Sequence, residues 1–356
     1  MKAFDEIFVD KTKYGVKVQT SEYAEAGAHI IIDQGQSQIA GYTDQEDGVF
    51  EEVPVIIFGD HTRAIKYVDE PFFLGADGVK VLRSKDENAN YKYLYYALKN
   101  VEIPNTGYNR HFKWLKKVQI EYPDSNVQAK IVNILDKVSD LIGKKNAQLL
   151  ALDDLVRSRF VELFGECRKR VFLNDLCSII TDGTHQPPKF QSDGVPFIFV
   201  SNLARNIITY DTEKYISDET YLELYKRTPI EIGDVLLSTV GSYGHPAVVT
   251  EAKKFLFQRH IAYLKPKHDI VNSFFLHSAL LSPDGQRQIK EKVKGIAQKT
   301  LNLSEIRKIE IPLPELQKQN EFADFVHQID KSKLIVQKEL DETQLLFDSL
   351  MQEYFG

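Results

Sequence analysis

The sequence predicts a mixed α+β fold (α/β in content), in which two similar globular domains are separated by two long antiparallel helices. Two runs of regularly spaced apolar residues, 127–164 and 322–355, both end in Phe-Gly. A shift of 191 positions places the first run on the second without a gap. Apolar steps that alternate between three and four residues are typical of a helix face packed on a partner helix, as in a coiled coil. The shift also indicates an internal repeat, so we expect pseudo-twofold symmetry.

The residues expected to pack between the two helices share this spacing. Under the shift Gln128 falls on Gln319 and Pro123 on Pro314, so the similarity extends beyond the apolar positions. The predicted packing residues are Ile131, Ile134, Val138, Leu149, Leu152 and Val156 in the first helix and Phe322, Phe325, Ile329, Leu340, Phe347 and Leu350 in the second. Lys145 interrupts the apolar face of the first helix, and such polar positions could fix the register of the pair.

The repeat divides the chain into four segments. They are a first globular domain at 1–123, a central long helix at 124–165, a second globular domain at 166–313 and a C-terminal long helix at 314–356. Asp124 or Ser125 would cap the first helix, because short polar side chains accept hydrogen bonds from the free N–H groups of a first turn. About 40 residues at 1.5 Å each make a rod of roughly 60 Å.

Each globular domain combines short apolar strands, polar loops and an apolar helix. In the first domain we expect strands at 29–32, 53–58 and 79–82, a helix at 91–98 and polar loops at 34–38 and 105–111. Matching segments of the second domain are 173–176 (for 4–7), 194–198, 234–238, 273–280 and the loop 295–302. The two globular domains are therefore expected to share one plan.

Composition narrows the class of protein. Of 356 residues 43% are hydrophobic, which is enough for more than one core. The apolar runs are too short to span a bilayer and the N-terminus lacks a signal-peptide core, so we expect a cytoplasmic protein with no membrane partner. Cys167 and Cys177 do not form a Cys-x-x-Cys, which argues against a disulfide framework or a cysteine zinc site.

The net charge of −6 argues against nucleic acid only when it is taken as a whole. Residues 1–123 carry a net charge of −4, residues 166–304 carry +3, and residues 305–356 carry −5. The acidic excess on the second helix is unfavourable for phosphates and suits a protein partner. Charge therefore permits DNA binding by the second globular domain and says little about the first.

Two related readers on a rod of about 60 Å would stand one to two DNA turns apart, a scale that suits two half-sites across an unread spacer. Several motifs carry a more specific resemblance. One motif is Gly295-Ile296-Ala297-Gln298 followed by Leu301, Leu303, Ile306, residues 309–314 and Gln319. Its first copy is Gly107, residues 109–111, Leu115, residues 118–120, Pro123 and Gln128. Three further motifs of the second domain are residues 181–185, 200–203 and 235–244. In this order, and duplicated, they make the chain similar to the specificity subunit of type I restriction–modification systems.

The resemblance implies that each globular part is a target-recognition domain for one half of a bipartite site in double-stranded DNA. It also implies that the helices set the spacer and dock two modification subunits, which methylate adenine. A motor–nuclease restriction subunit would complete a complex that defends against foreign DNA. The chain itself would then have no catalytic residues and no cofactor, and S-adenosylmethionine would be bound by the partner. The first domain lacks the Asp-Gly-Thr-His of residues 182–185, and Thr12-Lys13-Tyr14-Gly15 stands roughly there.

Candidate DNA contacts are side chains that can form paired hydrogen bonds in the major groove, such as Arg with guanine and Asn or Gln with adenine. For each of them a solvated loop residue is the alternative. In the first domain the candidates are Gln36, Gln38, Arg63, Asn109 and Arg110. In the second they are Thr184, His185, Asn202, Arg205, Ser242, Tyr243, Gln258, Arg259, Gln298 and Lys299. Lys299 suits a phosphate and Ser242 a turn, whereas Tyr243, like Tyr108, could pack on a sugar or in the core.

The sequence contains partial matches to catalytic and metal-binding motifs, but none of them is complete. Residues 186–189 (Gln-Pro-Pro-Lys) lack the first and last residues of an adenine methyltransferase loop, and the sequence has no P-loop. Asp284 and Glu291 have a spacing loosely like a nuclease, but they lie in a charged, helix-rich segment. His185, His245 and His260 do not have metal-ligand spacing, so no metal is expected. Asp60-His61 beside Arg63 has no partnered nucleophile.

Two other functions remain open from the sequence. The chain could be an enzyme whose active site has no familiar motif. It could also be a structural adaptor, in which the helical hairpin works without direct DNA readout.

Overall fold

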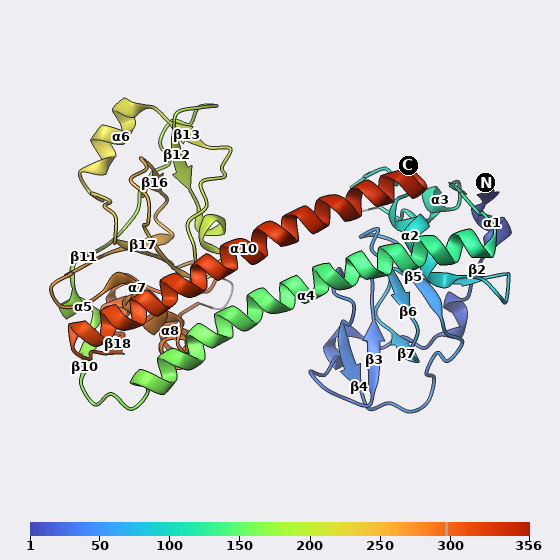
Figure 1. The fold of residues 1–356 in the computed structure, drawn as a ribbon, viewed down its shortest axis with the longest axis horizontal. Helices are drawn as coiled ribbons and strands as arrows, with labels where there is room; N and C mark the ends of the chain where they lie inside the picture. The colour runs from blue at the N-terminus through green and yellow to red at the C-terminus, as the bar shows by residue number, and fades with distance from the viewer. Residues whose placement is uncertain (108, 296–297) are drawn as a thin grey trace. The chain divides into compact units, whose positions relative to one another are not determined.

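The computed structural model describes residues 1–107, 109–295 and 298–356; Tyr108, Ile296 and Ala297, which belong to the loops and motifs named above, lie outside them. The chain forms two compact units. Unit 1 comprises Met1–Lys145 with Glu339–Gly356, and unit 2 comprises Asn146–Lys338. Figure 1 shows that each unit combines sheets with parts of the two long helices.

Unit 1 is built on a four-stranded antiparallel sheet. Its strand order is β2 (Phe8–Asp10), β8 (Val79–Ser84), β5 (Val55–Gly59) and β6 (Ile65–Val68). A three-stranded sheet contains β4 (Gly41–Thr43), β3 (His29–Ile32) and β7 (Phe72–Leu74), with β3 and β7 parallel. The short strands β1 (Lys2–Ala3) and β9 (Gln119–Ile120) pair beside them.

The apolar run of β5 explains why it lies at the centre of unit 1. Val55 and Ile57 belong to the core shared with the three-stranded sheet, whereas Ile56 and Phe58 face the core shared with the helices. Successive side chains of a strand point to opposite faces, so a strand buried on both faces needs a continuous apolar run. The helices of this unit are α1 (Phe4–Ile7), α2 (Tyr91–Lys99), α3 (Phe112–Leu115), the first part of α4 (Ser125–Phe164) and the last part of α10 (Leu316–Phe355), with 3-10 turns at Thr12–Tyr14 and Thr20–Glu22.

Unit 2 repeats this topology. Its four-stranded sheet has the order β11 (Cys177–Asp182), β17 (Ile261–Pro266), β14 (Val235–Ser238) and β15 (Pro246–Val248). Its three-stranded sheet has the order β13 (Tyr215–Ile216), β12 (Val195–Ile198) and β16 (Leu256–Phe257), and β12 and β16 are again the parallel pair. The short pair is β10 (Arg170–Phe172) with β18 (Glu310–Pro312).

The helices of unit 2 occur at the matching places in the element order. α5 (Leu173–Leu176), α7 (Ser273–Leu281), α9 (Leu303–Ile306) and α10 (Leu316–Phe355) correspond to α1, α2, α3 and α4. Unit 2 adds α6 (Asp218–Tyr225), α8 (Pro283–Lys292) and a 3-10 turn at Val200–Leu203. The predicted duplication of one mixed helix-and-sheet plan is confirmed.

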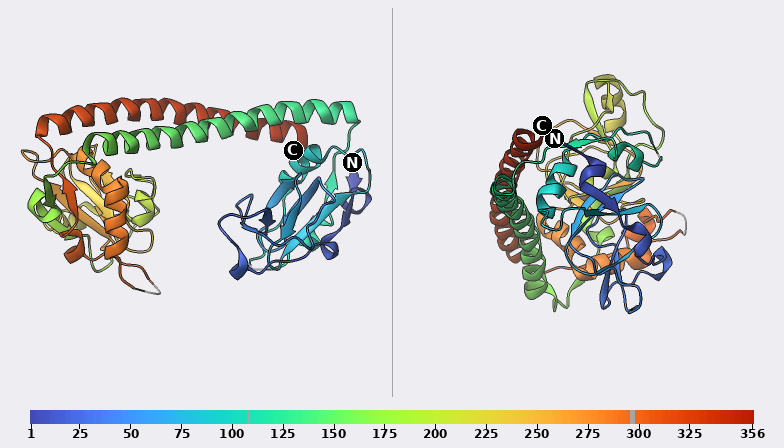
Figure 2. Two further views of the ribbon diagram at one scale, coloured as in Figure 1. Left: turned by 90° about the horizontal axis from the view of Figure 1, so that it is seen from below. Right: turned by 90° about the vertical axis from the view of Figure 1, so that its right-hand side faces the viewer.

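The two long helices run in opposite directions, which can be followed within each unit. In unit 1 the early α4 residues Ile131 and Leu135 share a core with Phe347 and Met351, near the end of α10. In unit 2 the late α4 residue Phe160 shares a core with α10 residues near its start. Figure 2 shows the two helix segments side by side in each unit.

Ion pairs between α4 and α10 accompany this apolar packing in each unit. Lys145 of α4 pairs with Glu339 of α10 in unit 1. In unit 2, Lys333 Nζ lies 2.5 Å from Asp153 Oδ1. Because each pair joins one residue of α4 to one of α10, these contacts support the expected role in setting the register.

The predicted helix seam needs one correction. Ile134 is 38% exposed, whereas its neighbour Leu135 is fully buried. The reason is that α4 also packs on α2: Asp136 accepts hydrogen bonds from Lys92 Nζ (2.6 Å) and Tyr96 Oη (2.8 Å). The predicted position Ile131 is buried, and Leu135 takes the place of Ile134 on the buried face. Of the other predicted positions, Val138, Phe322 and Phe347 are buried, and Leu149, Leu152, Val156, Phe325, Ile329, Leu340 and Leu350 are half-buried.

The glutamines that match under the 191-residue shift hold the start of each long helix. Gln128 Nε2 donates to the carbonyl of Pro123 at 2.9 Å, and Gln319 Nε2 donates to the carbonyl of Pro314 at the same distance. Gln319 also accepts a hydrogen bond from the N–H of Asn272, at the N-cap of α7. These motif residues therefore have a structural role, which fixes the helix to its globular part.

The two cysteines lie in different surroundings, and this leads to a first prediction. Burial raises the pKa of Cys177 to about 12, so its thiol stays protonated at pH 8, where alkylation requires the thiolate. Cys167 is partly exposed. We expect iodoacetamide at pH 8 to modify Cys167 of the folded protein and to leave Cys177 intact, as measured by peptide mass mapping. Both should react in guanidinium chloride, and equal labelling in the folded state would contradict the burial.

Candidate nucleic-acid interface

Four loops of unit 2 meet at one edge of its main sheet. The N–H of Thr184 donates to the carbonyl of Phe257 at 2.9 Å, and the N–H of Arg259 donates back to Thr184 at 3.0 Å. The N–H of Thr239 donates to the carbonyl of His260 at 2.9 Å, and Leu301 donates to Thr239 at 2.8 Å. These bonds join the loops after β11 and β14, the turn between β16 and β17, and the loop before α9.

The joined loops bring together eight of the ten candidates of unit 2. Ser242, Arg259, Gln298, Lys299 and His185 are exposed, and Thr184, Tyr243 and Gln258 are half-buried. Gly241 donates to the carbonyl of Lys299 at 3.2 Å, which fixes the loop after β14 against the loop before α9. Tyr243 packs against the main core, in agreement with the core alternative considered for it. We call this group of loops the unit 2 edge.

Charge at the unit 2 edge comes mainly from two side chains. Arg259 and Lys299 are both exposed, whereas His185 Nε2 lies 2.8 Å from Asp182 Oδ2 and Arg227 pairs with the other oxygen, Oδ1, of the same carboxylate. Burial, reinforced by the positive charge of Arg259, lowers the pKa of His260, so this ring is neutral at pH 7. Arg259 is therefore the candidate best suited to paired hydrogen bonds with guanine.

Asn202 and Arg205 lie outside the unit 2 edge; the burial of Asn202 corrects its prediction, whereas base contact by the exposed Arg205 stays a prediction. Asn202 is only 6% exposed: its Oδ1 accepts from the N–H of Phe199 at 2.9 Å and its Nδ2 donates to the carbonyl of Thr209 at 2.9 Å. It therefore holds its own loop. Arg205 is exposed, but it lines a cavity of about 350 Å³ with side chains of α4, α7 and α10, such as Asp153.

Unit 1 forms the matching edge around Asp60, the residue after β5. The carbonyl of Asp60 accepts from the N–H of His111 at 2.8 Å, its Oδ1 accepts from the N–H of Phe112 at 2.7 Å, and its own N–H donates to Gly78 at 2.7 Å. Gln34 joins a further loop, because its Nε2 donates to the carbonyl of Asp77 at 3.0 Å. Loops 33–38, 60–64, 75–78 and 105–111 therefore make the unit 1 edge, although residue 108 is not described.

Four of the five candidates of unit 1 are exposed, and three of the five also support the backbone. Gln36, Gln38, Asn109 and Arg110 are exposed, Arg63 is half-buried, and Asn109 also donates to the carbonyl of Thr106. Gln38 Nε2 donates to the carbonyl of Tyr67 at 2.7 Å, and Arg63 Nη1 donates to Ile103 at 3.1 Å. The polar ends of Gln38 and Arg63 thus support the fold, and their contact with DNA stays a prediction.

Sequence reasoning missed two features of unit 1. Gln34 lies close to the chosen Gln36, but only the fold brings it against Asp77. Lysines 113, 116 and 117 surround α3, directly after the loop that carries Asn109 and Arg110. Their clustering around the single tryptophan, Trp114, was a signal in the sequence, but the net negative charge of residues 1–123 concealed it.

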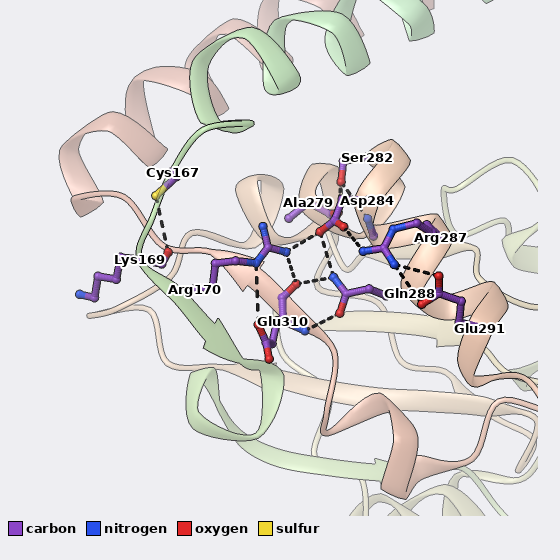
Figure 3. A network of polar contacts seen from close by, with 11 residues as sticks. Cys167, Lys169, Arg170, Ala279, Ser282, Asp284, Arg287, Gln288, Glu291 and Glu310 are labelled. Carbon is purple, nitrogen blue, oxygen red and sulfur yellow. Dashed lines mark hydrogen bonds and ion pairs between the residues drawn. The ribbon is translucent and has the colours of Figure 1, made fainter.

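The carboxylates that loosely resembled a nuclease are held by arginines and glutamine (Figure 3). Asp284 accepts from Arg170, from Arg287 Nη2 at 2.6 Å and from Gln288 Nε2 at 2.9 Å. Glu291 pairs with the same Arg287 at 2.8 Å. Burial would raise the pKa of Asp284, but the hydrogen bonds from Arg287 and Arg170 outweigh it and hold this pKa below its usual range. This network joins α8 to β10 and β18.

The remaining candidates for catalysis or metal binding also have structural partners. Asp60 is buried, and its carboxylate accepts a hydrogen bond from a backbone N–H group. His245 Nδ1 lies 3.0 Å from Asn206 Oδ1. Within residues 1–107, 109–295 and 298–356, no group of three or more His, Cys, Asp or Glu side chains could hold a metal ion. In the same part of the chain, no helix combines the length and apolar character needed to cross a membrane.

Comparisons with known proteins agree with this architecture. A family model described as the type I restriction modification DNA specificity domain matches residues 9–151 and 168–344. The chain is 25% identical to the type I restriction enzyme EcoR124I/EcoR124II specificity subunit of Escherichia coli over 341 residues, covering 90% of this chain and 83% of that protein. It is 23% identical to the MjaVIII specificity subunit of Methanocaldococcus jannaschii, covering 90% and 82%.

A solved structure shows the same fold. The crystal structure of the S subunit of a type I restriction–modification system from M. genitalium superposes with a TM-score of 0.55 at 17% identity. The superposition covers 100% of this chain and 95% of that chain. At this identity the similarity concerns the fold alone.

Proposed function

Because this chain belongs to the type I restriction–modification DNA specificity family, we propose that each unit reads one half of a bipartite site in double-stranded DNA. The unit 1 edge and the unit 2 edge would face the bases. The two long helices would set the spacer between the half-sites and dock two modification subunits. S-adenosylmethionine and the methyl transfer would belong to those subunits, and a motor–nuclease restriction subunit would join the full complex. The chain itself would recognise DNA without catalysing a reaction.

One observation carries this proposal: a single topology is used twice and presents different side chains at the matching edge. The loop before α3 exposes Asn109 and Arg110, whereas the matching loop before α9 exposes Gln298 and Lys299. Base edges in the major groove are distinguished by their donors and acceptors. Two edges with different donors and acceptors would therefore select two different half-sites.

The long helices support a role in docking protein rather than DNA. Leu150 of α4 and Leu334 and Leu345 of α10 are 66%, 72% and 69% exposed. The C-terminal helix is also acidic, which disfavours phosphates. Exposed apolar side chains on an acidic helix suit the surface of another protein better than a duplex.

We expect Arg259→Ala to relax the base preference of one half-site and to leave the other unchanged. Loss of a paired contact with guanine costs about 1–3 kcal/mol, or roughly 5- to 150-fold in discrimination at that base pair. The measurement is selection from a library of randomised duplexes by the full chain with its co-purifying partners. Arg205→Ala, an exposed arginine of the same unit that lies outside the edge, is the matched control.

This selection, together with an assay of methyl transfer, separates the proposed function from the two that the sequence left open. Equal weakening of all sequences by Arg259→Ala would make this residue a phosphate contact only. A wild-type complex with no sequence preference would favour the helical-hairpin adaptor without direct DNA readout. Transfer of a labelled methyl group to DNA by the isolated chain would instead make the chain an enzyme.

A further inference from the structure

Four lysines of unit 1 gather around two aromatic rings at α3. Lys113 Nζ and Lys117 Nζ lie 5.5 Å and 4.9 Å from the centre of the Trp114 ring. Lys116 Nζ and Lys80 Nζ lie 5.2 Å and 5.0 Å from the centre of the Phe112 ring. Each ring therefore holds two ammonium groups, and the rings orient them by cation–π attraction. We call Lys80, Lys113, Lys116 and Lys117 the α3 lysine patch.

Most of the charge in this patch is not neutralised by the protein. Lys80 Nζ lies 3.2 Å from Asp10 Oδ2. For the exposed Lys113, Lys116 and Lys117, the described part of the chain contains no acidic partner within 4.0 Å. Like charges placed this close repel one another, and a bound anion relieves that repulsion. Such a concentration of positive charge is unexpected in a segment whose net charge is −4.

The matching helix of unit 2 provides an internal comparison. Under the 191-residue shift, Trp114 falls on Glu305, and Lys116 and Lys117 fall on Arg307 and Lys308. Glu305 Oε1 lies 3.5 Å from Lys308 Nζ, and Arg307 donates to the carbonyl of Ile180. The two cations at α9 are thus used within the protein, whereas their counterparts at α3 are available to a ligand.

The position of the patch indicates what that ligand is. α3 follows directly after the loop with Asn109 and Arg110, and Asp60 fixes both, because it accepts from the N–H groups of His111 and Phe112. The patch therefore continues the unit 1 edge. A row of ammonium groups beside base-reading side chains suits the phosphates of a duplex, since lysine binds phosphate as a point charge and phosphate contacts fix a reader in position.

We propose that the α3 lysine patch binds the phosphodiester backbone of DNA beside the half-site read by unit 1, while α9 of unit 2 makes no such contact. This inference rests on the proposed function and deepens it. It gives the two units unequal roles: unit 1 supplies a phosphate anchor that is independent of sequence, although residues 1–123 carry a net charge of −4. The anchor would hold unit 1 in register while its loop residues read bases.

The test is a variant with Lys113→Gln, Lys116→Gln and Lys117→Gln, measured in the full chain with its co-purifying partners. The slope of log K against log salt should become shallower by about 2–3, because each lost phosphate contact removes roughly 0.9. Affinity at moderate salt should fall by roughly tenfold or more on every sequence, and the preferred bases should stay the same. Glutamine keeps the length of the stem, and thermal unfolding should match that of the wild type.

A matched pair of single variants sharpens the comparison. Lys117→Gln should lower the salt slope by about 1, whereas Lys308→Gln, at the equivalent position of unit 2, should leave it unchanged. An unchanged slope in the triple variant would overturn the proposal. Loss of a co-purifying protein with DNA affinity intact would also overturn it and would make the patch a protein-docking surface. If the triple variant showed a shallower slope while the wild-type protein had no base preference, the phosphate anchor would stand and the proposed function would be rejected.

Discussion

Replacing Phe322 by Ala is expected to lower the free energy of unfolding of unit 2 by about 3–5 kcal/mol. Phe322 is 2% exposed and lies at the centre of an aromatic cluster that joins α10, α4 and α7. Its ring centre lies 5.5 Å from Phe160, 5.6 Å from Phe164 and 6.4 Å from Phe275. The truncation removes apolar contacts and leaves a cavity that the three rings cannot fill without moving.

Denaturant unfolding, followed by hydrogen exchange of peptides from unit 2, measures this loss without requiring the two units to unfold together. Leu334→Ala on the same helix is the control, since Leu334 is 72% exposed and its truncation should change stability by no more than about 0.5 kcal/mol. If both variants lost the same small amount, the cluster would not be what holds α10 to unit 2.

The repeated architecture could be predicted from the sequence because it depends on apolar runs and on their repeated placement along the chain. Apolar runs as continuous as those of β5 and β14 require strands buried on both faces, and their equal placement in the two halves fixed the correspondence. The helix register was less certain. Between Ile131 and Val138, either residue 134 or residue 135 fits the helical spacing of buried positions. The packing of α2 against α4 at Asp136 places Leu135, and not Ile134, on the buried face.

Individual contacts were harder to predict, because a polar side chain in a loop can either face solvent or complete its own backbone. Asn202 and Gln38 were chosen for their amide groups, but those groups bond to neighbouring carbonyls. Ion pairing cannot be predicted from the sequence either: Lys117 and Lys308 occupy equivalent positions, and among the residues that the structure describes only Lys308 has an acidic partner, Glu305. Local hydrogen bonds compete for the same side chains that recognition uses.

We propose that the long helices hold the two units at a fixed spacing on DNA, and a matched insertion tests this proposal. One heptad would be inserted between Lys145 and Asn146 of α4 and another between Lys338 and Glu339 of α10. Both insertions fall where the two units divide, so each unit keeps its own contacts. Seven helical residues add about 10 Å, or roughly three base pairs of DNA. The same heptad inserted between Ala252 and Lys253, in an exposed loop, is the control.

The measurement is selection from duplexes in which the half-sites and the length of the spacer are both randomised. We expect the variant with two lengthened helices to select the same two half-sites with a spacer longer by about three base pairs, while the control keeps the original spacer. An unchanged spacer in the lengthened variant, with both half-sites still selected, would contradict this proposal.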